Sequence, residues 1–344
     1  MSDAAPALLA RVLRGGRTES VHRGSIAVVD EDGVMLASCG DPGGSIYLRS
    51  AAKPFQVMPL LTGGGEAAFR LGNDEIALMC ASHGGEPRHV RVARRILARG
   101  GFGVSDLACG PHPPMDEPSA RALVAAGEKP SALHNNCSGN HAGLLLTCRL
   151  LGLPSRGYWE PWHPVHAEIL ARLSEFTDVP SATVGLAVDG CSLPVFFLPL
   201  SALALSYARL LARGWPGEGG KAAGRIARAM NASPGMVAGR DRFTTDFLEA
   251  GAGKWIGKEG AEGVYALALK GRGRHEKAVG IAFKIEDGST RARDAVCLAI
   301  LEKLGRLSPP LKKKLARWRD PEIRNARGLS VGQLRAEVSL SPDG

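Results

Sequence analysis

Ser50 and Lys53 form an S-x-x-K motif, the pairing in this chain with the clearest chemical meaning. A strand-like run at 46–48 leads into the serine, and Pro54 follows where the first turn of a helix tolerates proline. A lysine one turn after a serine at a helix N-terminus lies on the same face, so its nitrogen can reach the serine oxygen. A serine hydroxyl becomes a nucleophile when a neighbouring base takes its proton. The motif therefore predicts nucleophilic catalysis, with an ordinary helix start as the alternative.

Lys53 can take a proton from serine only if its own pKa falls by several units, through burial or a second cation nearby. The alanines at 51–52 and the apolar residues that follow the lysine supply small, apolar surroundings of that kind. About one S-x-x-K match is expected by chance in a chain of this length, so the motif needs support from other residues.

Two further segments supply that support. Ser82 ends an expected helix and is followed by a polar, glycine-flanked cluster, where a second hydroxyl could relay a proton. Lys258 precedes an expected strand, and Gly260 permits a close backbone approach beside the active serine. The alternatives are a polar helix C-terminus for Ser82 and a solvated loop lysine for Lys258. Together the three segments resemble the S-x-x-K, second-serine and K-x-G trio of the penicillin-recognising enzymes.

The elements that position these residues are expected to form a sheet built from early and late segments. Runs 26–29 and 34–37 flank an Asp-Gly turn, which is typical of a β-hairpin. Strands are also expected at 46–48, 184–188, 264–269 and 278–285, and helices at 55–61, 73–79, 86–99, 144–151, 201–213, 221–230 and 290–304. Strands towards both ends with helices between them predict an α/β protein. No linker-like stretch separates independent units, so we expect residues 1–344 to form a single domain with two lobes.

The composition argues against several classes of protein. The net charge of +9 is concentrated in short runs such as 91–99 and 312–314, which are typical of solvated helix faces. Aromatic residues make up 5% and do not interleave with the basic runs, so we expect no nucleic-acid partner. No apolar run approaches ~20 residues, so we expect no membrane association. Residues 1–16 lack the features of a signal peptide, and the seven cysteines are typical of reduced thiols, which together predict a cytoplasmic protein.

Five blocks of the chain are similar to one family. They are YLRSAAKPFQ (47–56), CASHGGEPRHV (80–90), NNCSGNHAGLL (135–145), VDGCSLPVFFLPL (188–200) and KEGAEGVYALAL (258–269). In this order and over nearly the whole chain, they resemble the L-asparaginase II family of the Rhizobium etli type. The resemblance implies a β-lactamase-like α/β fold, a homodimer, and hydrolysis of L-asparagine to L-aspartate and ammonia. It makes Ser50 and Lys53 one Ser-Lys tandem and Ser82 and Lys258 the second, with an acyl-enzyme on Ser50.

The same resemblance raises the question of a metal ion. In that family two cysteines and a lysine hold zinc beside the site; Cys137 and Cys191 match the cysteines, but Asn140 stands at the lysine position. Thiolates are good zinc ligands and a neutral amide is a poor one. His141 lies four residues after Cys137 and could complete a ligand set with Asp189 or a water. Two alternatives therefore remain: a zinc site that is weakened or absent, and a zinc site that uses other ligands.

Three residues are candidates for binding substrate. The guanidinium of Arg49 matches the geometry of a substrate carboxylate, with a structural ion pair as the alternative. Asp189 could orient a ligand or bind the substrate amino group, and His141 is the third candidate. Whether glutamine is also a substrate is left open, because one methylene is worth only ~1–3 kcal/mol in a pocket.

Two other functions compete with an asparaginase. A β-lactamase or penicillin-binding type of acyl hydrolase shares the Ser-Lys logic but normally faces the periplasm. A catalytically weak or inactive zinc-binding homologue would keep the fold without turnover, and Asn140 is the residue that raises this alternative.

Overall fold

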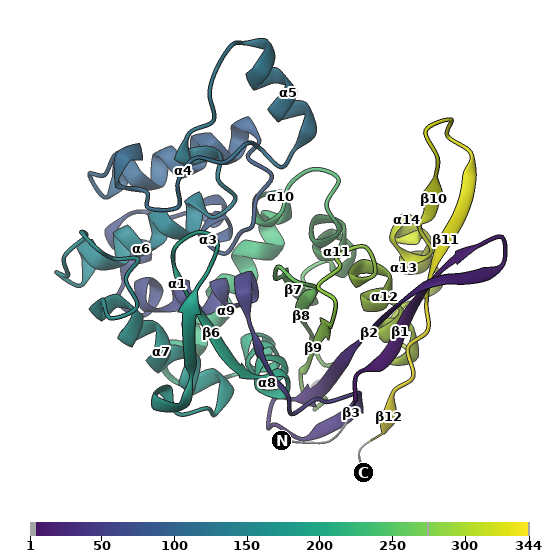
Figure 1. Ribbon diagram of the computed structural model, residues 1–344. Helices are drawn as coiled ribbons and strands as arrows, with labels where there is room; N and C mark the ends of the chain where they lie inside the picture. The colour runs from purple at the N-terminus through teal and green to yellow at the C-terminus, as the bar shows by residue number, and fades with distance from the viewer. Residues whose placement is uncertain (1–4, 274, 343–344) are drawn as a thin grey trace.

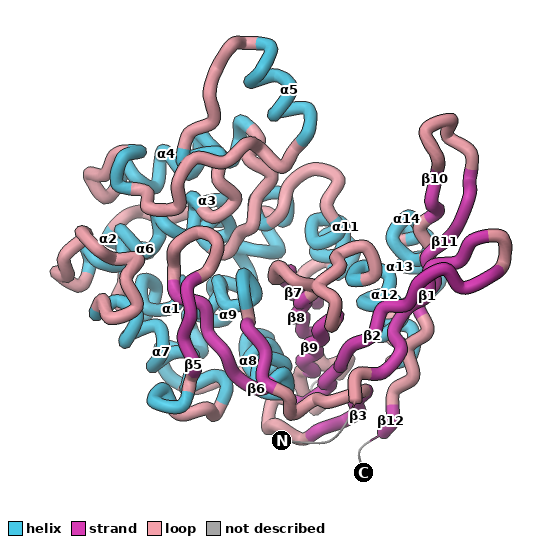
Figure 2. Tube along the Cα trace, viewed as in Figure 1, coloured by secondary structure: helices cyan, strands magenta, loops and turns pink. Residues whose placement is uncertain are grey.

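The computed structural model describes residues 5–273 and 275–342. The expected domain of residues 1–344 and the expected lack of a signal peptide therefore fall partly outside the described residues. Figures 1 and 2 show a twisted sheet on one side of the molecule and a group of helices on the other. The predicted α/β class, a sheet with flanking helices, is confirmed. The single domain with two lobes stays a prediction.

The main sheet joins segments from both ends of the described chain. Its strands follow one another in the order β10 (Glu322–Arg324), β11 (Ser330–Ala336), β1 (Ala7–Arg14), β2 (Arg17–Asp30), β9 (Val279–Ile285), β8 (Val264–Leu269) and β7 (Trp255–Glu259). In addition, β3 (Met35–Cys39) pairs with β2, and β12 (Ser341–Pro342) pairs with β3. All of these pairings are antiparallel. The predicted mixing of early and late segments in one sheet is confirmed.

The predicted hairpin is formed by β2 and β3. The Asp30 carboxylate accepts hydrogen bonds from the backbone N–H groups of Asp32 (3.0 Å) and Val34 (2.9 Å). Gly33 takes φ +87°, in the left-handed region that favours glycine. The first half of β2 is polar and partly exposed, which is why the apolar pattern revealed only its last residues.

Two helices cover the faces of the sheet. Every residue of β8 and nearly every residue of β9 is buried, which requires cover on both faces. Helix α8 (Leu200–Leu211) packs on β2, β8 and β9, and α12 (Arg293–Lys303) packs on β8 and β11. Gly280 lets α8 approach β9, since a Cβ at this position would lie 1.9 Å from the carbonyl oxygen of Ala204.

A small second sheet leads into the candidate site. Its order is β4 (Ser45–Tyr47), β6 (Pro194–Pro199) and β5 (Gly185–Val188), with both pairings antiparallel. Because β4 and β5 flank the same central strand, the residues that follow them, Arg49 and Asp189, are brought to one place.

The other helices lie mainly on the far side from β1 and β11, except for the last two, α13 (Pro309–Lys314) and α14 (Ala316–Arg319), which lie beside β10 and β11 (Figure 1). The rest are α1 (Lys53–Thr62), α2 (Gly65–Ala68), α3 (Asn73–Met79), α4 (Pro87–Arg99), α5 (Glu117–Ala125), α6 (Ser138–Leu150), α7 (Pro164–Thr177), α9 (Gly217–Ala232), α10 (Pro234–Val237) and α11 (Phe243–Gly251). Helix α1 lies among α6, α7 and α9. No described helix is long and apolar enough to cross a membrane.

Two of the differences from the sequence prediction concern site residues. Lys258 lies inside strand β7 and is completely buried, so the solvated-loop alternative is wrong. Helix α6 begins at Ser138 and not at 144, and its polar first turn is buried. In both cases polar residues interrupt the apolar pattern because they are packed against one another and not against solvent.

Candidate active site

Ser50 lies in a short 3-10 helix, η1 (Arg49–Ala52), between β4 and α1. The segment before it is fixed by the N–H of Leu48, which donates to the carbonyl oxygen of Phe196 in β6 at 2.9 Å. Arg49 takes φ +49°, an uncommon value for a residue with a Cβ and one that is often found at functional sites. The Ser50 side chain is partly exposed, so a substrate can reach its hydroxyl.

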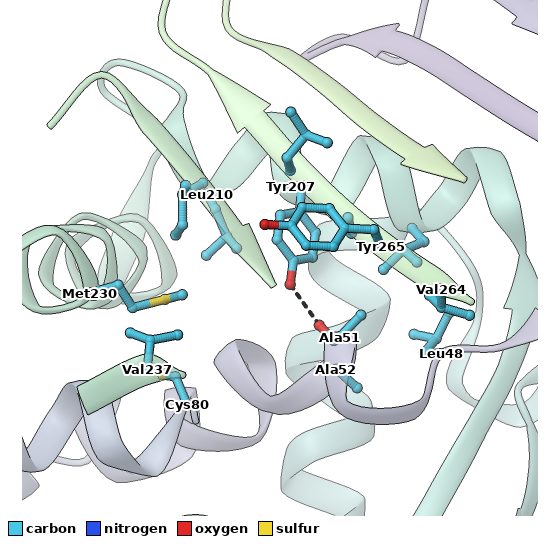
Figure 3. Close-up of a cluster of buried hydrophobic side chains, with 14 of the residues drawn as sticks. Leu48, Ala51, Ala52, Cys80, Tyr207, Leu210, Met230, Val237, Val264 and Tyr265 are labelled. Carbon is cyan, nitrogen blue, oxygen red and sulfur yellow. Dashed lines mark hydrogen bonds between the residues drawn. The ribbon is translucent and has the colours of Figure 1, made fainter. Parts of the chain in front are cut away.

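Tyr207 holds η1 from the side of α8. Its hydroxyl donates to the carbonyl oxygen of Ala51 at 2.8 Å, and the ring is completely buried (Figure 3). The cluster around this bond includes Leu48, Ala52, Cys80, Val264 and Tyr265 (Figure 3). Nothing in the sequence distinguishes Tyr207 from a core residue, because a tyrosine in an apolar helix is typical of a core position.

Lys53 points away from solvent, with 3% of its surface exposed. Its Nζ donates to the carbonyl oxygen of Ala81 at 2.6 Å, to Oγ of Ser82 at 3.3 Å and to Sγ of Cys137 at 3.2 Å. Among the described residues, Ser50 is not one of its hydrogen-bond partners. The predicted direct contact between the Lys53 nitrogen and the Ser50 oxygen is therefore absent from the residues that the structure describes.

The charge state of Lys53 also differs from the prediction. Burial alone would lower its pKa, but the sulfur atoms of Cys137 and Cys191 and the carboxylate of Asp189 outweigh burial, and the pKa is raised. The predicted fall of the Lys53 pKa is wrong, because its neighbours are anionic and not the small apolar groups that the sequence indicates.

Ser82 joins the two lysines. It follows α3, and its backbone N–H donates to the carbonyl oxygen of Val237 at 3.1 Å. Its Oγ receives a hydrogen bond from Nζ of Lys258 at 2.9 Å, in addition to that from Lys53. The lysines of the two predicted tandems thus meet at the Ser82 hydroxyl, and no hydrogen bond within the described residues joins Ser50 to it.

Lys258 is the lysine whose pKa is lowered. Its Nζ donates to Oγ of Ser82 and to the carbonyl oxygen of Glu259 at 2.6 Å. Burial lowers its pKa to about 7, with Lys53 and Arg242 acting in the same direction and the carboxylate of Glu259 opposing them. A lysine with a pKa near neutrality can accept a proton at the pH of a cell.

Glu259 is a buried carboxylate beside this lysine. Its Oε1 lies 3.9 Å from Nζ of Lys258 and 3.1 Å from Nη2 of Arg242, and the hydroxyl of Thr244 donates to Oε2. Burial raises its pKa, but the cations of Lys258 and Arg242 prevail and hold it at about 2. Sequence reasoning missed Glu259, although a charged residue between the lysine and glycine of a K-x-G motif is a visible signal.

Gly260 brings the Lys258 strand against the Ser50 segment. A Cβ on Gly260 would lie 2.9 Å from the carbonyl oxygen of Leu48, closer than real Cβ atoms come to backbone. Helix η1 also packs on β7 and β8. The predicted close approach of the Lys258-to-Gly260 segment to the active serine is confirmed at the level of the main chain.

Cys137 and Cys191 are brought together beside Lys53. Their thiols are linked by a hydrogen bond, which together with the Lys53 ammonium lowers the pKa of Cys137 to about 6 although burial opposes it; the pKa of Cys191 is raised. The N–H of Cys137 donates to the side chain of Asn135 at 2.9 Å, which fixes the start of α6. The sulfur atom with the lowered pKa, that of Cys137, is therefore the one that accepts the hydrogen bond of the Lys53 ammonium.

Asn140 and His141 are buried in the first turn of α6. The Asn140 amide donates to the carbonyl oxygen of Met79 at 3.2 Å, and its Oδ1 has no hydrogen-bond partner among the described residues. His141 is completely buried, its Nδ1 lies 2.6 Å from the hydroxyl of Tyr158, and burial lowers its pKa to about 3. A role for His141 in binding substrate stays a prediction.

These donors do not fit a zinc ion. Structural zinc takes four Cys, His, Asp or Glu ligands, and catalytic zinc three with an open position. The described residues bring together no group of three such side chains. Sγ of Cys137 instead accepts a hydrogen bond from Lys53, and Asn140 is bound to the backbone of α3.

Arg49 and Asp189 form an ion pair next to the nucleophile. Nη2 of Arg49 lies 2.8 Å from Oδ1 of Asp189, and the same oxygen accepts the N–H of Gly190 at 2.7 Å. Both side chains are partly exposed, at 24% and 17%. Arg49 therefore forms the structural ion pair that the sequence offered as an alternative. Because both side chains are partly exposed, a substrate can still reach the two charged groups.

Comparison with known proteins identifies the family. Residues 10–336 match the family described as L-asparaginase II. The chain belongs to that family. It is therefore an amide-hydrolysing enzyme, and the five sequence blocks lie within the matched range. A search of curated proteins returns no match.

Two solved structures show a weaker likeness. The covalent complex of the Bacillus subtilis glutaminase YbgJ with 5-oxo-L-norleucine is 12% identical, with 83% of this chain and 89% of that chain covered and a TM-score of 0.39. A probable glutaminase from Bacillus subtilis, complexed with 6-diazo-5-oxo-L-norleucine, is 11% identical, with 82% and 83% covered and a TM-score of 0.37. These TM-scores are too low to assign the fold, so the β-lactamase-like description rests on the resemblance alone.

Proposed function

We propose that this member of the L-asparaginase II family hydrolyses the side-chain amide of L-asparagine to L-aspartate and ammonia through an acyl-enzyme on Ser50. Family membership supports an amide substrate. The observation that carries the mechanism is the Ser82 hydroxyl, which lies 3.3 Å from Nζ of Lys53 and 2.9 Å from Nζ of Lys258. One of these lysines is held protonated and the other has a pKa near 7.

Lys53 acts on Ser50 with the help of Lys258. Neutral Lys258 takes a proton through the Ser82 hydroxyl from the Lys53 ammonium in the same step in which Lys53 takes the proton of Ser50, so Lys53 stays charged and Lys258 is the final acceptor. The Ser50 oxygen attacks the amide carbon, and backbone N–H groups, including that of Ser50, stabilise the oxyanion. The proton returns along the same path to the leaving nitrogen, ammonia departs, and water cleaves the ester to aspartate and free Ser50.

Arg49 and Asp189 match the two charged groups of an amino acid. A guanidinium binds a carboxylate and a carboxylate binds an ammonium, so the pair accepts a zwitterion that inserts between them. Glutamine differs by one methylene, which a pocket distinguishes by only ~1–3 kcal/mol. The two Bacillus subtilis structures are described as a glutaminase and a probable glutaminase, and we propose asparagine as the preferred substrate on the family match.

The test is ammonia release from asparagine and glutamine by the native chain, Ser50→Ala and the control Ser45→Ala, which removes an exposed hydroxyl in β4. We expect Ser50→Ala to lose about 10³-fold or more in kcat and the control to lose none. Full activity of Ser50→Ala would overturn the covalent mechanism. Acylation by a β-lactam without ammonia release from either amino acid would instead favour the acyl hydrolase of the penicillin type.

The homodimer and the cytoplasmic location stay predictions from the resemblance and the sequence. Light scattering on the purified chain measures the first, and fractionation of the cells that make the protein measures the second.

A further inference from the structure

A basic cavity lies among helices and strand ends, and none of its lining residues belongs to the candidate active site. It consists of two adjoining depressions of about 1330 Å³ and 670 Å³ that share Arg213, Ala252 and Lys270 in their walls. The cationic residues that line it are Arg213, Arg225, Arg228, Lys254, Lys270, Arg272, Arg306 and Lys314, and the acidic ones are Glu66 and Glu249. The smaller depression has no acidic residue in its wall.

Three of these cations are already engaged. Nε of Arg225 lies 2.6 Å from Oε1 of Glu66, and Arg306 lies 2.8 Å from Oε1 of Glu276. Arg272 donates to the carbonyl oxygen of Gly305. These contacts explain their positions without any ligand.

The other five cations have no such explanation. Arg213, Arg228, Lys254, Lys270 and Lys314 are exposed, and in residues 5–273 and 275–342 none of them forms an ion pair. They come from five segments: the end of α8, α9, the start of β7, the end of β8 and α13. Among the described residues, Glu249 is the one acid in the walls that forms no ion pair. Charges of one sign in a concave site focus the field on an oppositely charged ligand.

Helix ends account for part of this pattern. Basic residues are favoured near the C-terminus of a helix, which applies to Arg213 after α8 and Lys314 in α13. Lys254 also follows a helix end, since its backbone N–H donates to the carbonyl oxygen of Gly251 in α11 at 2.9 Å. Lys270 follows strand β8, and its backbone N–H donates to the carbonyl oxygen of Lys254 at 2.9 Å. The strand pairing therefore holds these two lysines side by side.

We propose that the basic cavity binds a small molecule that carries a chain of phosphates. Five unpaired cations spread over two depressions suit several negative charges in a row, whereas one carboxylate needs only two or three donors. Trp255, the one aromatic residue in the walls, is 7% exposed and stacks on Phe247 with ring centroids 5.0 Å apart. It cannot serve as a stacking platform for bases, so a single-stranded nucleic acid does not fit.

The test is calorimetric binding of inorganic tripolyphosphate and of ATP to the full chain, at low and high salt. We expect both to bind, with affinity falling as salt rises. Equal affinities mean that the phosphate chain is recognised, and tighter ATP binding means that the nucleoside adds contacts to it. Binding of neither anion would overturn the proposal. Because calorimetry measures binding and not amide hydrolysis, its result tests the cavity separately from the proposed function.

Two double variants separate the cavity from net charge. Arg213→Gln with Lys270→Gln removes the two cations that both depressions share, and we expect affinity to fall about tenfold or more. Lys129→Gln with Arg156→Gln removes the same charge from exposed residues that do not line the cavity, and we expect a change below about twofold. Equal losses in the two variants would overturn the proposal. Circular dichroism checks that both fold, since all four side chains are exposed.

Discussion

At the scale of single residues, the protonation of the site depends on which charges surround each lysine. Lys53 and Lys258 are both buried, and burial lowers the pKa of each. Lys53 faces sulfur atoms and stays charged, whereas Lys258 faces one carboxylate and two cations and approaches neutrality. Ser82 lies between them, so one lysine can donate a proton while the other accepts it.

The first prediction concerns pH. Because Lys258 must be neutral to accept a proton, kcat/KM is expected to rise with pH through about 7. Glu259→Gln removes the carboxylate that favours the charged lysine, so this limb should move to lower pH. Glu168→Gln removes an exposed carboxylate in α7 that is not part of the site; it is the control and should leave the limb unchanged. A limb that stays in place or moves to higher pH in Glu259→Gln would contradict the assignment.

A second prediction at this scale concerns the metal. The donors around Cys137 and Cys191 do not fit zinc, so the purified protein is expected to carry less than one zinc per chain and to keep its activity after chelation. Elemental analysis and an ammonia assay before and after chelator treatment measure both. Stoichiometric zinc that is lost in Cys137→Ser would show that the sulfur pair recruits a further ligand.

At the scale of elements, the site depends on how closely β7 approaches η1. Gly260→Ala would place a Cβ 2.9 Å from the Leu48 carbonyl oxygen, so the segment that carries Ser50 must shift. We expect roughly tenfold lower kcat and a loss of about 1–3 kcal/mol in unfolding free energy. Gly224→Ala, in the middle of α9 with a nearest neighbour at 3.6 Å, is the matched control and should be neutral or slightly stabilising. Assays of activity and denaturant unfolding on both variants decide the point, and unchanged kcat in Gly260→Ala would refute it.

At the scale of the whole molecule, stability depends on the meeting of the chain's early and late strands. Leu334 of β11 lies opposite Val12 of β1 and is 2% exposed, whereas Leu329 in the same hairpin is 53% exposed. Leu334→Ala is expected to lower the unfolding free energy by about 2–5 kcal/mol, and Leu329→Ala by less than about 0.5 kcal/mol. Denaturant unfolding measures both. A loss of unfolding free energy in Leu334→Ala as small as that in Leu329→Ala would mean that this edge of the sheet contributes little to stability.

Several features of this protein follow from the sequence alone. The hairpin at Asp30, the strand into Ser50, the helix after Pro54 and the strands β8 and β9 all have local signals in turn residues and apolar runs. The candidate residues Ser50, Ser82 and Lys258 were also identifiable, because their spacing and order match a family. Turn residues and apolar runs act on the chain within a few residues, so the elements that they specify can be predicted without knowing which segments pack together.

The tertiary structure decided the rest. Strand β7 and the first turn of α6 carry buried polar residues, which break the apolar periodicity that reveals an element. The roles of the two lysines depend on neighbours from distant segments: Cys137 beside Lys53, and Arg242 with Glu259 beside Lys258. A pKa is set by the charges within a few ångströms, and those distances exist only after folding. For that reason the sequence identified Ser50 and Lys53, while only the structure showed that Lys258 is the lysine near neutrality.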